Sequence, residues 1–299
     1  MTVHLEIVMQ NLIKRVTQSL IKRSMIMLNE EFSRQRRQID DAFRGLEKEK
    51  KQLESAYTDL EKTAKALDSD AAELPEEINS FINQLIENNF SMTSRLNLSN
   101  TALACINAVE NKINGDFVEC GVWRGGHGIL ASFVFSLYNS DKKVYLYDTF
   151  EGMTPPSNND IRIFDDLPAT KLFEIDADSL CNCSLEQVKK NFEIMKAPQK
   201  NVEFIKGDVR LTLEREINLP KKISVLRLDT DLYDSTKIEL QKLYGLVEDQ
   251  GVIIFDDYGY WAGQKTACDE FFEESDVKPY LVRIGGGTRL MIKKMKAIS

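Results

Sequence analysis

Two short stretches, L-R-L-D-T-D-L-Y-D-S-T at 226–236 and G-V-I-I-F-D-D-Y at 251–258, decide the fold of this chain. In each stretch an apolar run ends in acidic residues. Apolar runs of this length between turn signals are typical of buried parallel strands. Ligands of open α/β sheets bind outside the carboxyl ends of the strands, so Asp229, Asp256 and Asp257 are expected to meet at one edge of the sheet.

Three carboxylates at one site repel one another unless a cation or protons offset their charge. A set of oxygen ligands alone favours Mg²⁺, Ca²⁺ or Mn²⁺. The alternative is helix capping, because an Asp that follows a strand often caps the next helix. Two strands end in this way and one carries an acidic doublet, so the pattern favours a metal site over capping alone.

An alternation of short apolar runs and helical stretches begins at Asp116. Helical sequences separate the first five runs, which predicts parallel strands with right-handed crossovers. Only G-G-G-T at 285–288 joins the last two runs, which is typical of a hairpin. The expected fold is therefore α/β, a Rossmann-like sheet of five parallel strands plus an antiparallel hairpin, which is the strand plan of class I methyltransferases. The expected strands cover residues 117–120, 144–147, 202–205, 223–228, 252–255, 280–284 and 289–292.

The N-terminal part of the chain has a different pattern. Apolar side chains recur at every seventh position from Met25 to Leu67, and no proline interrupts them. This spacing predicts that residues 1–75 form a helical extension with a coiled coil, and that the protein is a homo-oligomer. The alternative is a long helix packed on its own protein. Residues 76–114 are expected to form a helical cap ahead of a methyltransferase domain at 115–299.

Composition limits the class of protein. The formal net charge is -8, whereas a nucleic-acid-binding protein is expected to have a basic face, so no nucleic-acid partner is predicted. No apolar stretch approaches the roughly 20 residues that cross a bilayer, and the N-terminus lacks a signal-peptide core. Five scattered cysteines suit a reducing compartment, so a cytoplasmic location is expected. The chain contains only two histidines, which argues against a histidine-based metal site and against a Ser-His-Asp triad.

Residues 154–184 fit neither a helix nor a strand pattern, because they hold three prolines and several acids. A long loop inside a compact α/β domain is usually an active-site lid or a binding loop. This segment is therefore a candidate lid.

Turns at the ends of the first three strands predict a nucleoside site. The glycines of E-C-G-V-W-R-G-G at 119–126 let the backbone approach a ligand at a helix N-terminus. Asp148 can accept hydrogen bonds from ribose hydroxyls or cap a helix, and Asp208 can accept one from the exocyclic amine of adenine. This series fits S-adenosylmethionine better than a nicotinamide cofactor, because the turn lacks G-x-G-x-x-G. The candidate cofactor residues are Glu119, Gly121, Val122, Trp123, Arg124, Gly125, Gly126, Asp148, Phe150, Gly207, Asp208 and Val209.

Taken together, five motifs resemble the TylF/MycF-type macrocin O-methyltransferase family. They are G-D-F-V-E-C-G-V-W-R-G-G at 115–126, Y-D-T-F-E-G-M at 147–153, G-D-V at 207–209, the stretch at 226–236, and F-D-D-Y-G-Y-W-A-G at 255–263. The resemblance covers about residues 88–299 and leaves residues 1–75 outside the usual pattern. His127 stands where the family commonly has a small hydroxyl residue, which is a departure next to the cofactor loop.

The resemblance implies an S-adenosylmethionine-dependent O-methyltransferase that acts on a sugar hydroxyl with Mg²⁺. It implies that Asp229, Asp256 and Asp257 hold the metal and that Asp229 is the general base. A divalent ion lowers the pKa of a bound hydroxyl, and a nearby carboxylate can take the proton. Tyr258 and Trp261 are candidate substrate contacts, with helix packing as the alternative. The expected acceptor is a glycan, a nucleotide sugar or a glycosylated natural product.

Two other functions are weighed against this one. The first is a methyltransferase for a catechol or another phenol. Relatives of that kind have a lysine three residues after the first metal acid, where this chain has Leu232. The second is a non-enzymatic coiled-coil assembly protein with a vestigial methyltransferase domain. The presence of all three metal acids and of the glycine-rich turn argues against the second.

Overall fold

The computed structural model describes residues 73–176, 181–275 and 277–294, a helical stretch at 44–53, and the isolated positions 22, 25 and 34. The chain divides into two compact units, Met1–Ala64 and Lys65–Ser299. Met25, Leu46 and Leu53, which share one heptad position, are 67%, 63% and 70% exposed. The other heptad positions, and with them the predicted coiled coil, lie outside the described residues.

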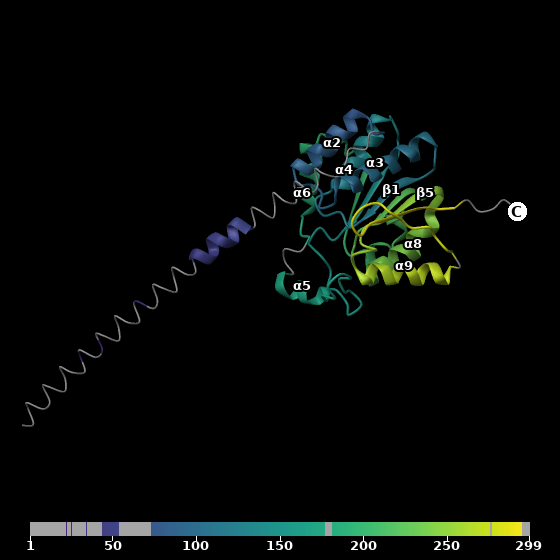
Figure 1. The fold of residues 1–299 in the computed structure, drawn as a ribbon. Coiled ribbons are helices and arrows are strands. Elements are labelled where there is room, and N and C mark those ends of the chain that lie inside the picture. Colours follow the sequence, from purple (N-terminus) through teal and green to yellow (C-terminus); the bar gives the residue numbers. More distant parts are fainter. Residues whose placement is uncertain are drawn as a thin grey trace, which may run out of the picture. The chain divides into compact units, whose positions relative to one another are not determined.

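A seven-stranded sheet forms the centre of the second unit (Figure 1). Its strands are β1 (Asp116–Cys120), β2 (Val144–Asp148), β3 (Val202–Lys206), β4 (Ile223–Leu228), β5 (Val247–Phe255), β6 (Val282–Arg283) and β7 (Arg289–Ile292). The strand order is β3-β2-β1-β4-β5-β7-β6. The first five strands are parallel, and β7 pairs antiparallel with both β5 and β6. The predicted α/β sheet of five parallel strands and a terminal hairpin is therefore confirmed.

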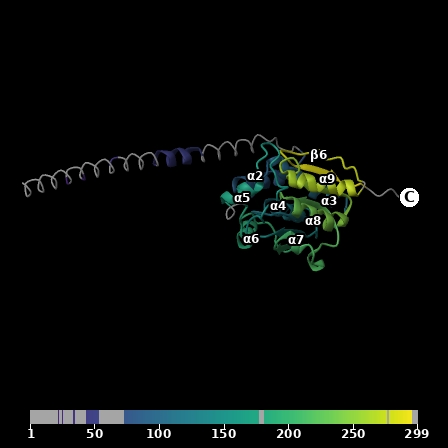
Figure 2. The same cartoon turned by 90° about the horizontal axis from the view of Figure 1, so that it is seen from below.

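Helices cover both faces of this sheet (Figure 1), and α8 and α9 run side by side on one of them (Figure 2). The helices that share a core with the first face are α2 (Glu76–Glu87), α3 (Arg95–Glu110), α4 (Gly126–Leu137) and α6 (Leu185–Ile194). Those of the second face are α7 (Val209–Thr212), α8 (Tyr233–Leu243) and α9 (Ala262–Glu274). Two 3₁₀ helices, η1 (Glu216–Asn218) and η2 (Tyr244–Leu246), flank β4 and α8.

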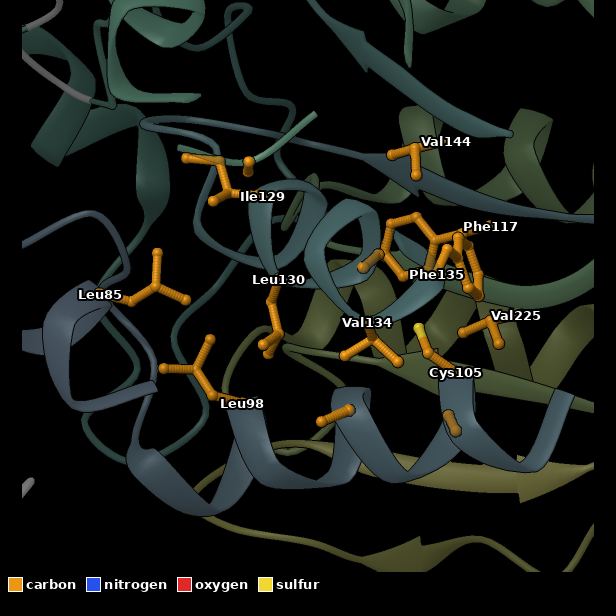
Figure 3. Close-up of a cluster of buried hydrophobic side chains, with 14 of the residues drawn as sticks. Leu85, Leu98, Cys105, Phe117, Ile129, Leu130, Val134, Phe135, Val144 and Val225 are labelled. Carbon is orange, nitrogen blue, oxygen red and sulfur yellow. The ribbon is translucent and has the colours of Figure 1, made fainter. Parts of the chain in front are cut away.

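The alternation of side chains along each strand produces two hydrophobic cores. Phe117 of β1 packs with the first layer of helices, and its neighbour Val118 packs with the second. In Figure 3, Leu98 of α3 and Leu130 of α4 lie in the first core together with Phe117 and Val225. The helices at 76–110 therefore share one core with the sheet.

Three details differ from the sequence prediction. The segment 154–184 contains α5 (Ala169–Asp176), so the expectation of no regular element there is wrong. Pro168 fixes the backbone directly before this helix, and good helix formers follow it. β5 begins at Val247 rather than Val252, because Val247 is itself buried in the second core and the polar stretch after it continues the strand. β6 is limited to two residues.

No helix in the part of the chain that the structure describes has both the length and the apolar character that a bilayer crossing requires.

Candidate active site

The glycine-rich turn connects β1 to α4 at the carboxyl edge of the sheet. Gly121 has φ +85°, and a Cβ added there would lie 1.8 Å from the carbonyl oxygen of Asp229. Gly125, the N-cap of α4, has φ +92°. Glycine adopts such angles without the strain that a side chain would cause. The turn after β1 therefore packs directly against the acidic end of β4.

Asp148, at the end of β2, holds this turn in place. Its Oδ2 accepts hydrogen bonds from the N–H groups of Val122 at 2.6 Å and Trp123 at 3.1 Å. Its Oδ1 accepts the N–H of Phe150 at 2.7 Å. Withdrawal from water raises the pKa of Asp148, and these three donors oppose that shift. The predicted ribose acceptor is therefore also the residue that organises the backbone of the turn.

Other predicted cofactor residues lie at the same edge, with distinct surroundings. Asp208 caps α7, and its carboxylate pairs with Arg210 at 2.5 Å. Glu119 is 1% exposed, and its carboxylate lies 3.5 Å from the guanidinium of Arg227. Withdrawal from water raises the pKa of Glu119 to about 8. Glu119 and the buried Phe150 therefore support the turn from within the core.

His127, the departure from the family pattern, ties α4 to the segment before α3. Its Nε2 lies 2.9 Å from the hydroxyl of Thr93, and its Nδ1 lies 2.9 Å from the hydroxyl of Thr101. Burial lowers the pKa of His127 well below its usual value. Both ring nitrogens bond to threonines, so the imidazole is a structural link and has no free nitrogen to act as a base.

Three carboxylates come together beyond β4 and β5. Asp229, Asp231 and Asp257 each offer an oxygen, and these oxygens lie within 4.8 Å of one another. No other such group of three His, Cys, Asp or Glu side chains occurs among the described residues. Oδ2 of Asp257 is buried and has no hydrogen-bond partner there. An orphaned carboxylate oxygen beside two further carboxylates fits a hard divalent cation.

The protein alone leaves the charge of this acidic group poorly compensated. Withdrawal from water raises the pKa of Asp229 and Asp257 well above the usual value, and raises the pKa of Asp231 to about 7. Repulsion within the group adds to the shift of each carboxyl. A bound cation would reverse this trend, because its charge stabilises the ionised forms.

Arg227 lies next to the acidic group and is fully buried. Its Nη2 is 3.0 Å from a carboxylate oxygen of Asp229 and 2.9 Å from one of Asp256. Asp256 thus lies beside the acidic group, and Asp231 joins Asp229 and Asp257 within it. The predicted ligand set therefore contains Asp256 in the place that Asp231 has in the structure. Both members of the acidic doublet follow the end of β5, where Asp256 contacts Arg227 and Asp257 joins the acidic group.

Two buried side chains that sequence reasoning missed support the loops of the acidic group. Gln264 of α9 accepts the N–H of Asp257 at 2.8 Å and donates to the carbonyl of Leu228 at 3.4 Å. Glu239 of α8 accepts the hydroxyl of Thr230 at 2.9 Å. Withdrawal from water raises the pKa of Glu239 to about 8. Both are ordinary polar residues of helices, so the sequence pattern carries no signal for them.

The candidate lid is attached to the same region through Asp160. This buried carboxylate accepts the N–H groups of Ser157 at 2.6 Å and of Tyr233, the first residue of α8, at 2.7 Å. A Cβ on Gly263 would lie 2.0 Å from Oδ1 of Asp160, so α9 also begins against it. The lid therefore contacts the starts of the two helices that follow the acidic loops.

The two predicted substrate contacts have different surroundings. The hydroxyl of Tyr258 donates to Asp269 of α9 at 2.6 Å, which matches the helix-packing alternative. Trp261 is 8% exposed, forms a backbone bridge with Arg162 of the lid, and makes an edge contact with Tyr260 at 5.5 Å between ring centroids. Contact with substrate stays a prediction for both residues.

Comparison with known proteins assigns the chain to a family. The family model described as macrocin-O-methyltransferase (TylF) matches residues 10–289. The chain belongs to the macrocin O-methyltransferase family. The match begins at residue 10, so the expectation that residues 1–75 lie outside the family pattern is wrong for most of that segment.

Relatives and a solved structure agree with this assignment. Demethyldecarbamoylnovobiocin O-methyltransferase of Streptomyces niveus is 32% identical over 62% of this chain and 69% of its own length. A relative from Streptomyces olivaceus, 8-demethyl-8-(2,3-dimethoxy-alpha-L-rhamnosyl)-tetracenomycin-C 4'-O-methyltransferase, is 33% identical over 55% of this chain and 61% of its own. The O-methyltransferase NovP, a solved structure, is 29% identical in sequence to this chain. Its structure matches with a TM-score of 0.61 over 69% of this chain and 83% of that one. The prediction of an O-methyltransferase is confirmed.

Proposed function

We propose that this macrocin O-methyltransferase family member transfers a methyl group from S-adenosylmethionine to a sugar hydroxyl of a glycosylated natural product, with a divalent cation at the site. The observation that carries the proposal is the group of Asp229, Asp231 and Asp257 next to the glycine-rich turn. The name of the Streptomyces olivaceus relative includes a rhamnosyl group, which supports a glycosylated acceptor.

The glycine-rich turn, Asp148 and Asp208 would hold S-adenosylmethionine, which supplies an activated methyl group. Asp148 already orders the turn through three backbone N–H groups, so its carboxylate would bind ribose hydroxyls at a fixed position. Asp208 would share its carboxylate between Arg210 and the adenine amine. Preorganised contacts of this kind place the methyl group for in-line transfer, and such positioning supplies much of the acceleration.

Asp229, Asp231 and Asp257 would hold Mg²⁺. Asp256 would support this site through its contact with Arg227, or would bind the cation with its second oxygen. A divalent cation at this group would supply a lowered pKa for the acceptor hydroxyl. An alkyl hydroxyl is a poor nucleophile at neutral pH, so the residues around it must also take its proton. The carboxylates of the group are the proton acceptors at hand.

Asp229 is the base that the family resemblance implies, and the geometry supports Asp231 as a second candidate. Asp229 is paired with the guanidinium of Arg227 at 3.0 Å, and that positive charge opposes proton uptake by its carboxylate. Asp231 carries no ion pair of this kind within the described residues. Its carboxylate would therefore be the freer of the two to accept the proton of the acceptor hydroxyl.

A methyl-transfer assay of the full chain tests the proposal. The panel contains rhamnosides and other natural-product glycosides, nucleotide sugars, free glycans and catechols, and mass spectrometry detects the added methyl group. We expect methylation of a glycoside, loss of turnover in excess chelator, and recovery with Mg²⁺. Methylation of phenols alone would support the catechol alternative, although the buried Leu232 occupies the position of the lysine found in such enzymes. Full turnover in chelator would contradict the metal requirement.

We also infer that the N-terminal unit associates with another copy of the chain. Met25, Leu46 and Leu53 share a heptad position and present exposed apolar side chains that a second helix would cover. Deletion of residues 1–64 should lower the number of copies per particle, obtained from the mass measured by light scattering. The cut is set there because Leu74 is already part of the main core. An unchanged number of copies would favour a helix packed on its own chain.

We infer a cytoplasmic location from the cysteines. All five are free thiols, as expected in a reducing compartment. Cell fractionation with an antibody against the chain checks this inference, and recovery of the protein outside the cytoplasm would contradict it.

A further inference from the structure

A buried chain of polar contacts runs from α3 to the acidic group. It begins at Asn97 in the first turn of α3 and passes through Thr288 in the turn between β6 and β7. It then reaches Asp256 and Arg227. Asn97, Thr288 and Arg227 are 8%, 2% and 0% exposed. Burial of polar groups is costly unless they are paired, so the partners of each group decide what this chain of contacts does.

The direction of each hydrogen bond follows from its chemistry. A carboxylate can only accept, so the Thr288 hydroxyl donates its single proton to Oδ1 of Asp256, at 3.2 Å. The same hydroxyl oxygen accepts a hydrogen bond from Nδ2 of Asn97 at 2.8 Å. A hydroxyl that accepts a hydrogen bond becomes a stronger donor. Asn97 therefore strengthens the contact between Thr288 and Asp256.

Asp256 shares one guanidinium nitrogen with Asp229. Nη2 of Arg227 lies 2.9 Å from Oδ1 of Asp256 and 3.0 Å from Oδ2 of Asp229. Nη2 carries two N–H groups and can donate one to each carboxylate, so both acids draw on the same positive charge, and in a buried environment this sharing has a large effect. A hydroxyl that donates to Asp256 offsets part of its charge and leaves more of the guanidinium for Asp229. The hydroxyl of Thr288 therefore influences how Asp229 is held.

The turn between β6 and β7 is shaped around this contact. Gly285 has φ +130°, and a Cβ there would lie 2.5 Å from Oδ1 of Asn97. The N–H of Thr288 donates to the carbonyl of Gly285 at 2.8 Å, which closes the turn. The backbone thus fixes Thr288 between Asn97 and Asp256. The resulting contacts connect α3 to the acidic group.

We propose that Thr288 and Asn97 are positioning residues of the cation site: they hold Asp256 against Arg227 and so fix the carboxylate of Asp229 for a divalent cation. This inference rests on the proposed function, in which Asp229 is a cation ligand. It assigns the hairpin turn and α3 a part in cation affinity, although neither contributes a member of the acidic group.

Calorimetric titration of Mn²⁺ into the full chain, with S-adenosylhomocysteine present, tests this role. Thr288→Val keeps the shape of the side chain and removes the hydroxyl. We expect the Kd for Mn²⁺ to rise about 10-fold, the lower end of the effect of outer partners of metal ligands. The Kd for S-adenosylhomocysteine should stay near the parent value. Thr288→Ser, which restores the hydroxyl, should recover the Mn²⁺ affinity.

Thr236→Val is the matched control. The Thr236 hydroxyl is fully buried and has no hydrogen-bond partner in the described residues, so its removal changes a buried threonine outside the chain of contacts. Its Mn²⁺ affinity should equal that of the parent. Asn97→Ala gives a second, independent variant, because it removes the donor to Thr288 while the hydroxyl remains. We expect it to weaken Mn²⁺ binding by less than Thr288→Val does, because the hydroxyl that contacts Asp256 remains.

The outcomes separate this inference from the proposed function. If the parent binds no Mn²⁺, the metal-dependent function fails and the inference fails with it. If the parent binds Mn²⁺ and both variants bind it equally well, the positioning role is overturned while the proposed function stands. Equal weakening of Mn²⁺ and S-adenosylhomocysteine binding would also overturn it, since that pattern indicates a general loss of structure.

Discussion

Two sites at the carboxyl edge of one sheet satisfy their acids in opposite ways. Asp148, at the nucleoside site, accepts hydrogen bonds from three backbone N–H groups, and its bonding is largely complete within the protein. Asp229, Asp231 and Asp257 form the acidic group and face one another, and one oxygen of Asp257 has no partner in the described chain. Buried polar groups are normally paired, and clustered carboxylates require a compensating charge. The contrast separates a site that orders backbone for a nucleoside from a site that recruits a cation.

The largest effect is expected at the acidic group. Asp231→Asn removes a basic carboxylate but keeps its shape, and turnover on the acceptor found in the panel assay should fall about 10²–10⁴-fold. The affinity for S-adenosylhomocysteine, measured by calorimetry, should remain near the parent value because other strands hold the nucleoside. Asp229→Asn is the companion variant, and a larger loss there would assign the base to Asp229. Undiminished turnover in both variants would contradict a carboxylate base at this edge.

A smaller effect is expected at the nucleoside site. Asp148→Ala leaves three backbone donors of the turn without their acceptor, a loss of about 1–3 kcal/mol for a buried group. S-adenosylhomocysteine should therefore bind roughly 5- to 150-fold more weakly in calorimetry. Glu151→Ala, an exposed acid on the same loop that pairs with Lys206, is the control and should bind normally. If Asp148→Ala binds S-adenosylhomocysteine as tightly as the parent, the role assigned to that carboxylate is wrong.

Sequence patterns predicted the parts of this molecule that depend on hydrophobic periodicity. The apolar runs that end at Leu228 and Phe255 became adjacent parallel strands, so the acids after them had to meet at one edge. The single-turn connection at 285–288 had to be a hairpin. These features follow from burial along a strand, which residue type alone reports.

Side-chain directions within the loops could not be predicted in the same way. Asp231 has φ +62°, an uncommon conformation for a residue other than glycine, and the pattern L-D-T-D-L gives no sign of it. Asp256 and Asp257 are chemically identical neighbours, and only their contacts in the fold, such as that of Arg227 with Asp256, distinguish them. Glu239 lies on α8 and contacts Thr230 only in the folded chain, so the sequence around it does not reveal this role.

Glu239 offers a third case, a buried acid with neither backbone donors nor a cation. Its pKa is raised from 4.5 to about 8 in the folded protein by withdrawal from water. Folding therefore takes up a proton between these pH values, and the contribution of this group to stability falls as pH rises from 4.5 towards 8. The Glu239→Gln variant has no titrating group at this position. As the pH rises across this window, its free energy of unfolding should increase relative to that of the parent by up to about 1.4 kcal/mol per pH unit.

Urea unfolding at several pH values across this window measures that difference. Glu273→Gln, at an exposed position of α9, is the control and should keep a constant difference from the parent. A constant difference for Glu239→Gln as well would show that Glu239 is ionised in the folded protein.

The most direct test of the contrast between the two sites is calorimetric titration of Mg²⁺ into the parent, Asp257→Asn and Asp148→Asn. Asp257 carries the orphaned oxygen, so its neutralisation should abolish or strongly weaken cation binding. Asp148→Asn should bind Mg²⁺ as the parent does, because its carboxylate serves the nucleoside site. Absence of binding by the parent, or equal binding by Asp257→Asn, would contradict the account.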